Sequence, residues 1–357
     1  METQKERELV RERMRGCLLV GAMGDALGRK AEFLSWEALK AEYGAGGVRE
    51  LEKDGKTLKA PITDDTQMTL FTASGLLWAD YLKKEKRDGR SYAECGILPS
   101  YLRWLYTQGW GEEDGSWLKL QNFERGQKTP ILSVRELYEE RGPGRACIVG
   151  LKNRQEKKMF DLTRKVNANS KGCGTIMRVA PVGLYFYRDP AAAYEEGKKS
   201  AAITHGHPTG QIAAGAFAEI IARVTGGEWL EEAIENVLKR VEGEERGGET
   251  ASAVRLAVKL AESDAGTHAS IAKLGEGWVA EEALAIALYC ALTQRNSRKA
   301  LIAAVNHDGD SDSTGAVCGN LLGAMYGMHG IPKDWLETVE LRDFIEETAD
   351  NLYEAAK

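Results

Sequence analysis

Apolar residues recur every three to four positions through most of the chain, and alternating runs of Val, Ile and aromatic residues are scarce. The first pattern is typical of helices that bury one face, whereas half-buried strands would show alternation. The sequence therefore predicts an all-α fold. Helices are expected near residues 5–28, 63–83, 91–107, 191–203, 209–225, 229–241, 250–262, 281–293, 313–327 and 340–356.

One stretch does not follow this periodicity. Residues 109–158 are rich in Gly and charged side chains, and they are predicted to form long surface loops around a short helix near 131–140. Neither a linker nor an internal repeat is evident, although a length of 357 residues would also suit two domains. We expect a single domain over residues 1–357.

Two of the predicted helices carry glycines on one face. The glycines are four residues apart, or a multiple of four: Gly16, Gly24 and Gly28 in the first helix, and Gly315, Gly319, Gly323 and Gly327 near the C-terminus. Each glycine costs a helix about 1 kcal/mol relative to Ala, and close helix packing would offset that cost. We predict that these two helices cross near the centre of the bundle.

Charge and composition limit the classes of function. The chain has 48 Lys and Arg against 54 Asp and Glu, a formal charge of -6. A mildly acidic protein lacks the clustered cations that nucleic acids attract, so a nucleic-acid partner is not expected. No apolar run reaches the roughly 18 residues that span a bilayer, and the charged start does not resemble a signal peptide. We expect a soluble, cytoplasmic protein without a membrane partner.

The cysteines add no covalent or zinc framework. Six are present, without a CxxC pair. Thiols in apolar or Gly-rich surroundings usually behave as small buried hydrophobes in a reducing compartment, so we expect them to be inert.

Two short segments place several carboxylates and hydroxyls where an apolar helix begins. They are Thr63-Asp64-Asp65-Thr66 and Asp308-Gly309-Asp310-Ser311-Asp312-Ser313-Thr314. One such side chain is enough to cap a helix, and crowded carboxylates repel one another unless a cation or protons intervene. Oxygen donors favour Mg²⁺, Mn²⁺ or Ca²⁺ over zinc or copper. The two segments together predict a metal site, with helix capping as the alternative.

The second segment also resembles two other motifs. Asp308, Asp310 and Asp312 have the spacing of an EF-hand loop, but its sixth and twelfth positions are Ser313 and Gly319, where Gly and Glu are needed. Asp310, Asp312 and Thr314 match the D-x-D-x-T signature of phosphatases with an aspartyl nucleophile. Those enzymes need a parallel sheet, which this chain does not supply.

Three further polar features accompany the acidic segments. Glu32 follows the Gly-rich end of the first helix, where a carboxylate can act as acid, base or water-positioning group, or form a surface ion pair. The glycines of Ser170-Lys171-Gly172-Cys173-Gly174 let backbone N–H groups approach an anion, although the segment matches neither a Walker nor a dinucleotide fingerprint. His205 and His207 lie at a helix-to-helix corner, where capping, burial and ligand contact all fit the pattern.

The order of these segments carries a family resemblance. GDALG followed by Glu32, then TDDT, SKGCG with a later MR, THGHPTG, and GDSDSTG before a Gly-rich helix resembles the ADP-ribosylglycohydrolase family over residues 16 to 330. The resemblance implies a compact, orthogonal helical bundle that binds two divalent cations, Mg²⁺ or Mn²⁺, where ADP-ribose sits.

The resemblance also assigns roles to residues. The implied metal ligands are Thr63, Asp64, Asp65, Asp310, Asp312 and Ser313, with Asp312 placed between the two ions. The implied catalytic groups are Asp64, Asp65 and Glu32, the last near the scissile bond. The implied substrate contacts, besides Glu32, are Ser170, Gly172 and Gly174 around the pyrophosphate and ribose, and His205.

The implied activity is metal-dependent hydrolysis of the glycosidic bond between ADP-ribose and a modified protein side chain. Arginine is the favoured acceptor, because SKGCG and THGHPTG are most similar to the arginine-specific hydrolases, although the spacing of Glu32 is more similar to the nitrogenase-regulating branch. The alternatives are a hydrolase for O-linked or nucleic-acid-linked ADP-ribose, a non-catalytic ADP-ribose-binding protein, and a phosphoesterase that cleaves the pyrophosphate. We expect an ADP-ribosylated protein and ADP-ribose as partners, and a monomer.

Overall fold

The computed structural model describes residues 3–111, 115–119, 127–263, 267–294 and 296–356. Within these ranges the regular structure is helical, and pairing of the β type is confined to isolated bridges between Ala60 and Val339 and between Gly172 and Val279. The all-α prediction is confirmed. None of the described helices is both long and apolar enough to cross a membrane.

The helices follow one another along the chain, and the longest connections between them are residues 44–63, 108–144 and 157–179. The first half contains α1 (Gln4–Gly28), α2 (Trp36–Tyr43), α3 (Asp64–Lys86), α4 (Leu98–Thr107), α5 (Arg145–Glu156), α6 (Ala180–Tyr185) and α7 (Pro190–Ala202). The second half contains α8 (Pro208–Thr225), α9 (Leu230–Glu242), α10 (Gly248–Ser263), α11 (His268–Ile271), α12 (Ala280–Thr293), α13 (Ser297–Val305), α14 (Ser311–Tyr326), α15 (Lys333–Thr338) and α16 (Arg342–Ala355). Single turns are η1 (Ala93–Ile97, a π turn) and the 3₁₀ turns η2 (Ser116–Lys119), η3 (Ile131–Ser133), η4 (Arg135–Tyr138), η5 (Cys173–Thr175) and η6 (Gly327–Gly330).

Each of the ten predicted helices is present, and the interpretation of residues 109–158 was right in part: the described residues before 145 form loops and short turns, but a helix follows. The expected short helix near 131–140 is the pair of 3₁₀ turns η3 and η4, and α5 occupies part of the predicted loop. Residues 112–114 and 120–126 of this stretch lie outside the described residues. The apolar periodicity did not predict α5, because the inner face of this helix includes Arg154. Arg154 is a buried residue that donates to five backbone carbonyl oxygens.

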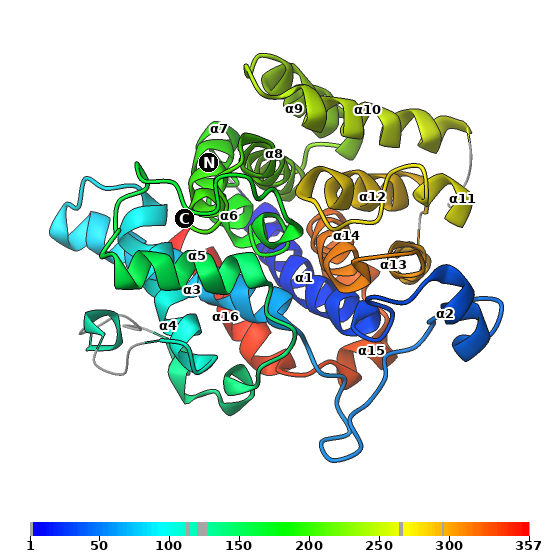
Figure 1. Ribbon diagram of the computed structural model, residues 1–357, viewed down its shortest axis with the longest axis horizontal. Coiled ribbons are helices and arrows are strands. Elements are labelled where there is room, and N and C mark those ends of the chain that lie inside the picture. The colour runs from blue at the N-terminus through cyan, green and yellow to red at the C-terminus, as the bar shows by residue number, and fades with distance from the viewer. Residues whose placement is uncertain (1–2, 112–114, 120–126, 264–266, 295, 357) are drawn as a thin grey trace.

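Helix α1 runs through the middle of the molecule beside α14 (Figure 1). A Cβ added at Gly24 would lie 2.0 Å from the carbonyl oxygen of Gly315, and one at Gly319 would lie 2.2 Å from that of Val20. These close approaches explain the glycine spacing. The pairs show that the two helices pack antiparallel along their length, rather than at a single crossing as predicted.

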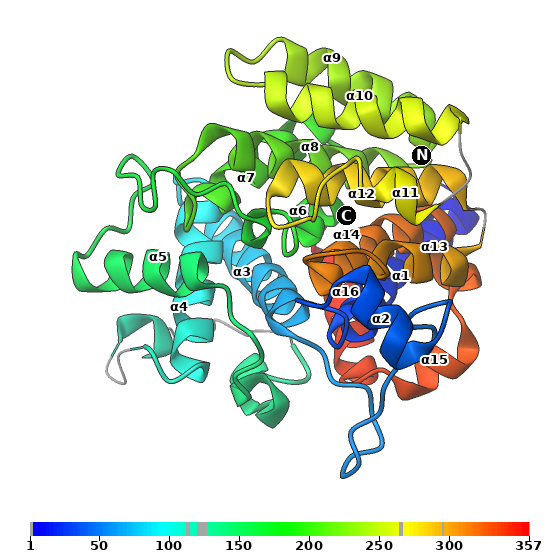
Figure 2. The same cartoon turned by 45° about the vertical axis from the view of Figure 1, so that its right-hand side comes forward.

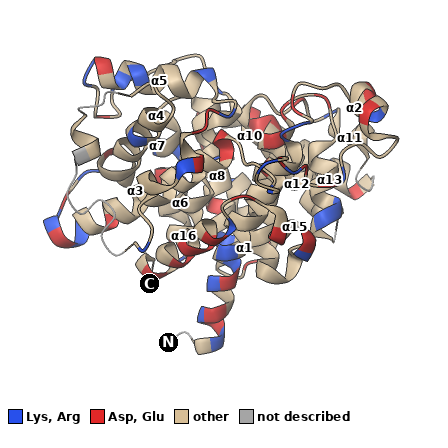
Figure 3. Ribbon diagram, turned by 90° about the horizontal axis from the view of Figure 1, so that it is seen from below, with Lys and Arg blue, Asp and Glu red and all other residues tan. Residues whose placement is uncertain are grey.

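The remaining helices surround this central pair. Helices α9 and α10 form an outer layer over α8 and α12, while α3, α4 and α5 lie on the opposite side of α1 (Figures 1 and 2). Seen from below, acidic and basic residues alternate along the projecting N-terminal part of α1 and are interspersed elsewhere (Figure 3). The C-terminal end of α1 lies against the start of α14, since a Cβ at Gly28 would be 2.2 Å from the carbonyl oxygen of Ser311.

Candidate functional site

The two acidic helix starts meet at the end of α1. Ser313, in the first turn of α14, donates its hydroxyl hydrogen bond to Asp65 Oδ1 at 2.9 Å, across 248 positions of sequence. The hydroxyl of Thr63, which precedes α3, donates to Asp65 Oδ2 at 3.3 Å. The fold therefore joins the two segments that the sequence analysis combined into one site.

Asp25 fixes the first turn of α3 from within α1. Its fully buried carboxylate accepts the backbone N–H groups of Thr63 at 3.0 Å and Thr66 at 3.1 Å, and also the Thr66 hydroxyl. In the sequence Asp25 belongs to a Gly-rich motif, but no role could be assigned to it there, because its partners lie about 40 positions later in the chain. Thr63, Asp64 and Asp65 are thus held in place by a carboxylate of another helix.

Helix capping does not account for the acidic side chains. Thr63 caps α3, because its side chain accepts the N–H of Asp65. Asp310 occupies the corresponding position before α14, yet its side chain makes no capping hydrogen bond. One hydroxyl is enough for α3, and the carboxylate that precedes α14 points elsewhere, so the aspartates have another role.

Burial without cationic partners leaves these carboxylates in mutual repulsion. Burial, followed by the charge of Asp312, raises the pKa of Asp64, Asp65 and Asp310 well above the usual range. Burial and the same charge raise the pKa of Asp25 to about 7 and that of Glu32 to about 8. In the part of the chain that the structure describes, no ion pair joins these carboxylates to Lys or Arg.

The donor set fits hard divalent cations. Carboxylate oxygens of Glu32, Asp310 and Asp312 lie within 4.8 Å of one another, and Ser313 links this group to Asp65. Oxygen donors that are buried and short of positive charge are those that Mg²⁺ and Mn²⁺ bind in proteins. Glu32, which the sequence analysis placed near the scissile bond, therefore also lies within reach of a cation, a role that it had not been given.

Cys173 belongs to the same cluster. All six cysteines are unpaired, and Cys173 is the half-buried one among them. Its thiol donates to Asp310 Oδ2 at 2.6 Å, and the Ser313 hydroxyl lies 3.5 Å from its sulfur. No sequence signal marks this position, because an isolated cysteine between glycines resembles any small buried residue.

The predicted anion loop passes beside the cluster at Cys173. Its backbone is fastened to the start of α12, since Cys173 N donates to Trp278 O at 3.0 Å and Ala280 N to Lys171 O at 2.9 Å. The Lys171 ammonium forms ion pairs with Glu249 and Glu281. The loop that holds Ser170, Gly172 and Gly174 is therefore anchored on both α10 and α12.

The imidazole ring of His205 lies against this loop, whereas His207 contacts it through its backbone, since His207 N donates to Ser170 O at 3.2 Å. A Cβ at Gly172 would be 3.4 Å from His205 Nε2, so the glycines allow the loop to approach the imidazole ring. Burial, followed by the charge of Arg178, lowers the pKa of His205 to about 3 and keeps the ring neutral. His207 instead caps α8, because its Nδ1 accepts the N–H of Thr209 at 3.2 Å.

Asp308 faces away from the acidic cluster. It accepts the backbone N–H of Trp36 at 2.9 Å and lies 3.3 Å from His268 Nε2. Because Asp308 contacts α2 and α11 instead, the spacing that resembles an EF-hand does not form an EF-hand loop here.

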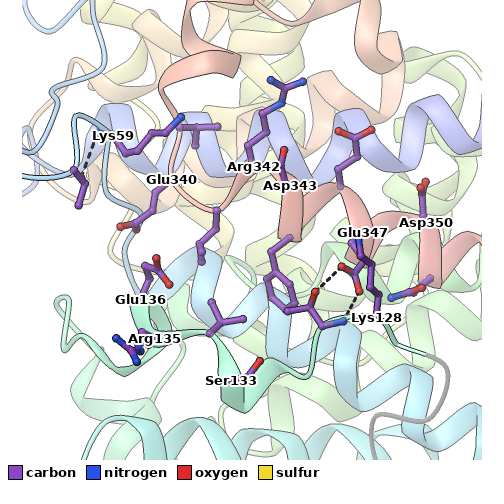
Figure 4. A pocket seen from close by; sticks show the side chains of 18 residues that line it. Lys59, Lys128, Ser133, Arg135, Glu136, Glu340, Arg342, Asp343, Glu347 and Asp350 are labelled. Carbon is purple, nitrogen blue, oxygen red and sulfur yellow. Dashed lines mark hydrogen bonds between the residues drawn. The ribbon is translucent and has the colours of Figure 1, made fainter.

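A cavity of about 1090 Å³ lies between the start of α16 and the turns η3 and η4 (Figure 4). Most of the acids around it have partners: for example, Glu347 accepts from Thr129, and Glu340 pairs with Arg141. Arg141 also donates to the carbonyl oxygen of Ile62 at 3.0 Å, just before α3. This cavity therefore backs onto the segment that leads into the acidic cluster, but four of the six carboxylates that line it are ion-paired or hydrogen-bonded.

Comparisons with known proteins agree with the family resemblance of the sequence motifs. The model of the ADP-ribosylglycohydrolase family matches residues 6–357. An uncharacterized protein of Archaeoglobus fulgidus is 30% identical over 349 residues, covering 96% of each chain. ADP-ribosyl-[dinitrogen reductase] glycohydrolase of Rhodospirillum rubrum is 24% identical, covering 93% of this chain and 92% of that one. ADP-ribosylarginine hydrolase Tri1 of Pseudomonas putida is 23% identical, covering 97% and 79%.

A solved structure supports the relationship. An ADP-ribosylglycohydrolase-related protein complex superposes with a TM-score of 0.66 and 25% identity, covering 99% of this chain and all of that chain. The match of the family model extends over nearly the whole sequence, including both acidic helix starts and the loop beside them. The chain therefore belongs to the ADP-ribosylglycohydrolase family of ADP-ribosyl hydrolases.

Proposed function

We propose that this protein hydrolyses the glycosidic bond between the distal ribose of ADP-ribose and a guanidinium nitrogen of a modified arginine, and that it requires two divalent cations, Mg²⁺ or Mn²⁺. The observation that carries the proposal is the contact between Ser313 and Asp65, which unites two unpaired acidic segments from opposite ends of the chain. A relative named for ADP-ribosylarginine, with 97% coverage of this chain, favours arginine as the acceptor.

In this proposal the oxygens of Thr63, Asp64, Asp65, Asp310, Asp312 and Ser313 would hold the cations. Bound cations would hold the vicinal hydroxyls of the distal ribose and fix the orientation of its ring. The uncompensated charge of the cluster supports this assignment, because a cation relieves the repulsion that otherwise raises the carboxylate pKa values.

The chain's own groups orient the substrate around this cluster. The glycines of residues 170–174 leave room for backbone N–H groups to meet a pyrophosphate, and the neutral ring of His205 lies directly behind them. Asp25 keeps the first turn of α3 in position, because it binds two of its backbone N–H groups. These contacts hold the scissile bond beside the carboxylates.

Proton transfer falls to Glu32, Asp64 or Asp65. Glycoside cleavage proceeds through a positively charged ribosyl transition state, which nearby carboxylates stabilise, and one carboxyl group protonates the leaving atom. Glu32 lies beside Asp310 and Asp312 without being one of the proposed cation ligands, and this position suits the role of acid for the leaving nitrogen. Asp64 and Asp65 are then available to orient the attacking water.

One experiment tests the proposal. The protein is incubated with arginine-linked, serine-linked and nucleic-acid-linked ADP-ribose, each with Mg²⁺, with Mn²⁺ and with a chelator, and the products are separated. We expect release of free ADP-ribose from the arginine-linked substrate only when a cation is present. Release of AMP would indicate pyrophosphate cleavage instead, and binding without turnover would indicate an ADP-ribose-binding protein.

A further inference from the structure

Phe33 stands exposed beside the acidic cluster. It directly follows Glu32, and 75% of its surface is accessible to solvent. Its backbone has a φ of +66°, a left-handed conformation that is unfavourable for a residue with a bulky side chain. An apolar ring that is both exposed and held in this conformation contributes nothing to the core, so its placement calls for another explanation.

Contacts with two other segments hold Phe33 in place. Its N–H donates to the carbonyl oxygen of Gly309 at 3.3 Å, and its ring stacks on Trp278 with centroids 5.2 Å apart and planes 26° apart. The indole N–H of Trp278 donates to Glu276 Oε2 at 3.0 Å, while the carbonyl oxygen of Glu276 accepts the N–H of Asp310 at 2.8 Å. The aromatic pair is therefore tied to the backbone of the acidic cluster.

The chemistry of this rim suits a flat cation. The face of an aromatic ring attracts cations, and a guanidinium stacks on it with its plane parallel to the ring. Glu276 is exposed and adds a negative charge beside the ring pair. A nucleotide base would also stack on an exposed ring, but the negative charges of Glu276 and Glu32 beside Phe33 favour a cationic partner over one that carries a diphosphate.

We propose that Phe33, supported by Trp278 and flanked by Glu276, recognises the guanidinium of ADP-ribosylated arginine and determines selectivity for that acceptor. This rests on the proposed function, because it is Glu32, beside Phe33, that lies near the bond between ribose and acceptor. Phe33 is a specificity-determining residue in this account and takes no part in proton transfer.

The test compares the arginine-linked substrate with free ADP-ribose, which has no acceptor. We expect Phe33→Leu to lower kcat/KM for ADP-ribosylarginine by about 5- to 30-fold, mainly through KM, which is the range of a partly desolvated cation–π contact. Phe33→Tyr should keep most of the wild-type value, because it retains the ring. The inhibition constant of ADP-ribose should stay within about twofold of wild type in both variants.

Matched controls separate this effect from a general disturbance. Trp229 is 76% exposed at the start of α9 in the outer layer and provides a matched control. Trp229→Leu should change neither kcat/KM for ADP-ribosylarginine nor the inhibition constant of ADP-ribose. Glu276→Gln should weaken the binding of ADP-ribosylarginine more than that of ADP-ribose. Thermal melting of Phe33→Leu should match wild type, because the side chain is exposed.

Three outcomes would overturn the inference. If Phe33→Leu weakens the binding of ADP-ribose as much as that of ADP-ribosylarginine, the ring contacts the nucleotide. If neither constant changes, the ring has no part in recognition. If wild-type protein with Mg²⁺ or Mn²⁺ releases no ADP-ribose from arginine, the proposed function itself fails, and this inference falls with it.

Discussion

The partly buried carboxylate of Asp350 and the carboxylates of the acidic cluster show two ways in which this chain treats negative charge away from bulk solvent. Asp350, in α16, accepts hydrogen bonds from Arg11 and Arg15 of α1, with the nearest atoms 2.6 Å apart in each ion pair. Burial opposes its ionisation, but these bonds outweigh burial and lower its pKa to about 2. Around Asp312, burial and neighbouring carboxylates raise the pKa values instead.

The difference separates a structural charge from a functional one. Where the chain supplies its own cation, as at Asp350, a carboxylate joins two helices. Where it gathers carboxylates and supplies no Lys or Arg within the described residues, the compensating charge has to come from protons or from a bound ion. We therefore infer that pairing, rather than cavity size, distinguishes the functional site in this fold.

The largest effect is expected when the cluster loses its central ligand. Asp312→Asn should abolish cation binding and lower the hydrolysis rate about a thousand-fold or more, because cations that orient the ribose would be lost. Calorimetric titration with Mn²⁺ and assays of ADP-ribose release measure both. Asp350→Asn should retain both properties. Full turnover by Asp312→Asn under strict chelation would show that the assignment is wrong.

A second change breaks the ion pair between Arg141 and Glu340. Glu340→Gln leaves the Arg141 guanidinium partly buried without its carboxylate, and we expect a loss of about 3–5 kcal/mol in the free energy of unfolding. Urea denaturation measures this loss. Replacing both residues by apolar ones of similar size should recover much of it. A loss below about 1 kcal/mol would mean that the pair is effectively solvated.

A third prediction concerns pH in the metal-free protein. The ordinary pKa of a glutamate is 4.5, whereas that of Glu32 in the folded protein is about 8, so the folded state binds its proton more tightly. Stability from this group is full below about pH 4 and is lost as the pH rises to about 8. Melting temperatures in a chelator should fall over that range, and Glu32→Gln should flatten the slope. If Glu32→Gln leaves the dependence of the melting temperature on pH unchanged, Glu32 does not share the charge of the acidic cluster.

The smallest effect, with the opposite sign in pH, is expected at Asp350. Asp350→Asn should lower stability by about 1 kcal/mol at neutral pH, since the ion pairs are partly exposed. Because the folded pKa of about 2 lies below the ordinary aspartate value of 3.8, this stability is present above pH 4 and is lost as the pH falls through 2. Denaturation at pH 7 and pH 2 measures the difference, and an equal loss at both pH values would contradict this account.

The sequence predicts the parts of this fold that depend on local pattern. The ten helices predicted from apolar periodicity are present, shorter ones such as α6 and α13 were missed, and the glycine spacing of α1 and α14 indicated their packing. Helix α5 was missed because Arg154 on its inner face is satisfied by carbonyl oxygens from later parts of the chain, and no local pattern encodes those partners.

The site was predictable to a similar extent. The acidic helix starts exceed what capping needs, so their residue types alone indicated a cation site. Asp25, Cys173 and Phe33 were not identified, because each acquires its significance from a partner distant in sequence: Thr63 for Asp25, Asp310 for Cys173 and Trp278 for Phe33. Tertiary contacts of this kind have no signature within a single segment.

The most direct test of the central claim is the anomalous diffraction of crystals grown with Mn²⁺ after removal of other metals. Our account predicts two manganese peaks within coordination distance of the carboxylates of Asp65 and Asp312, and none beside Asp350. Protein that hydrolyses its substrate with Mn²⁺ present, yet shows no manganese between the starts of α3 and α14, would contradict it.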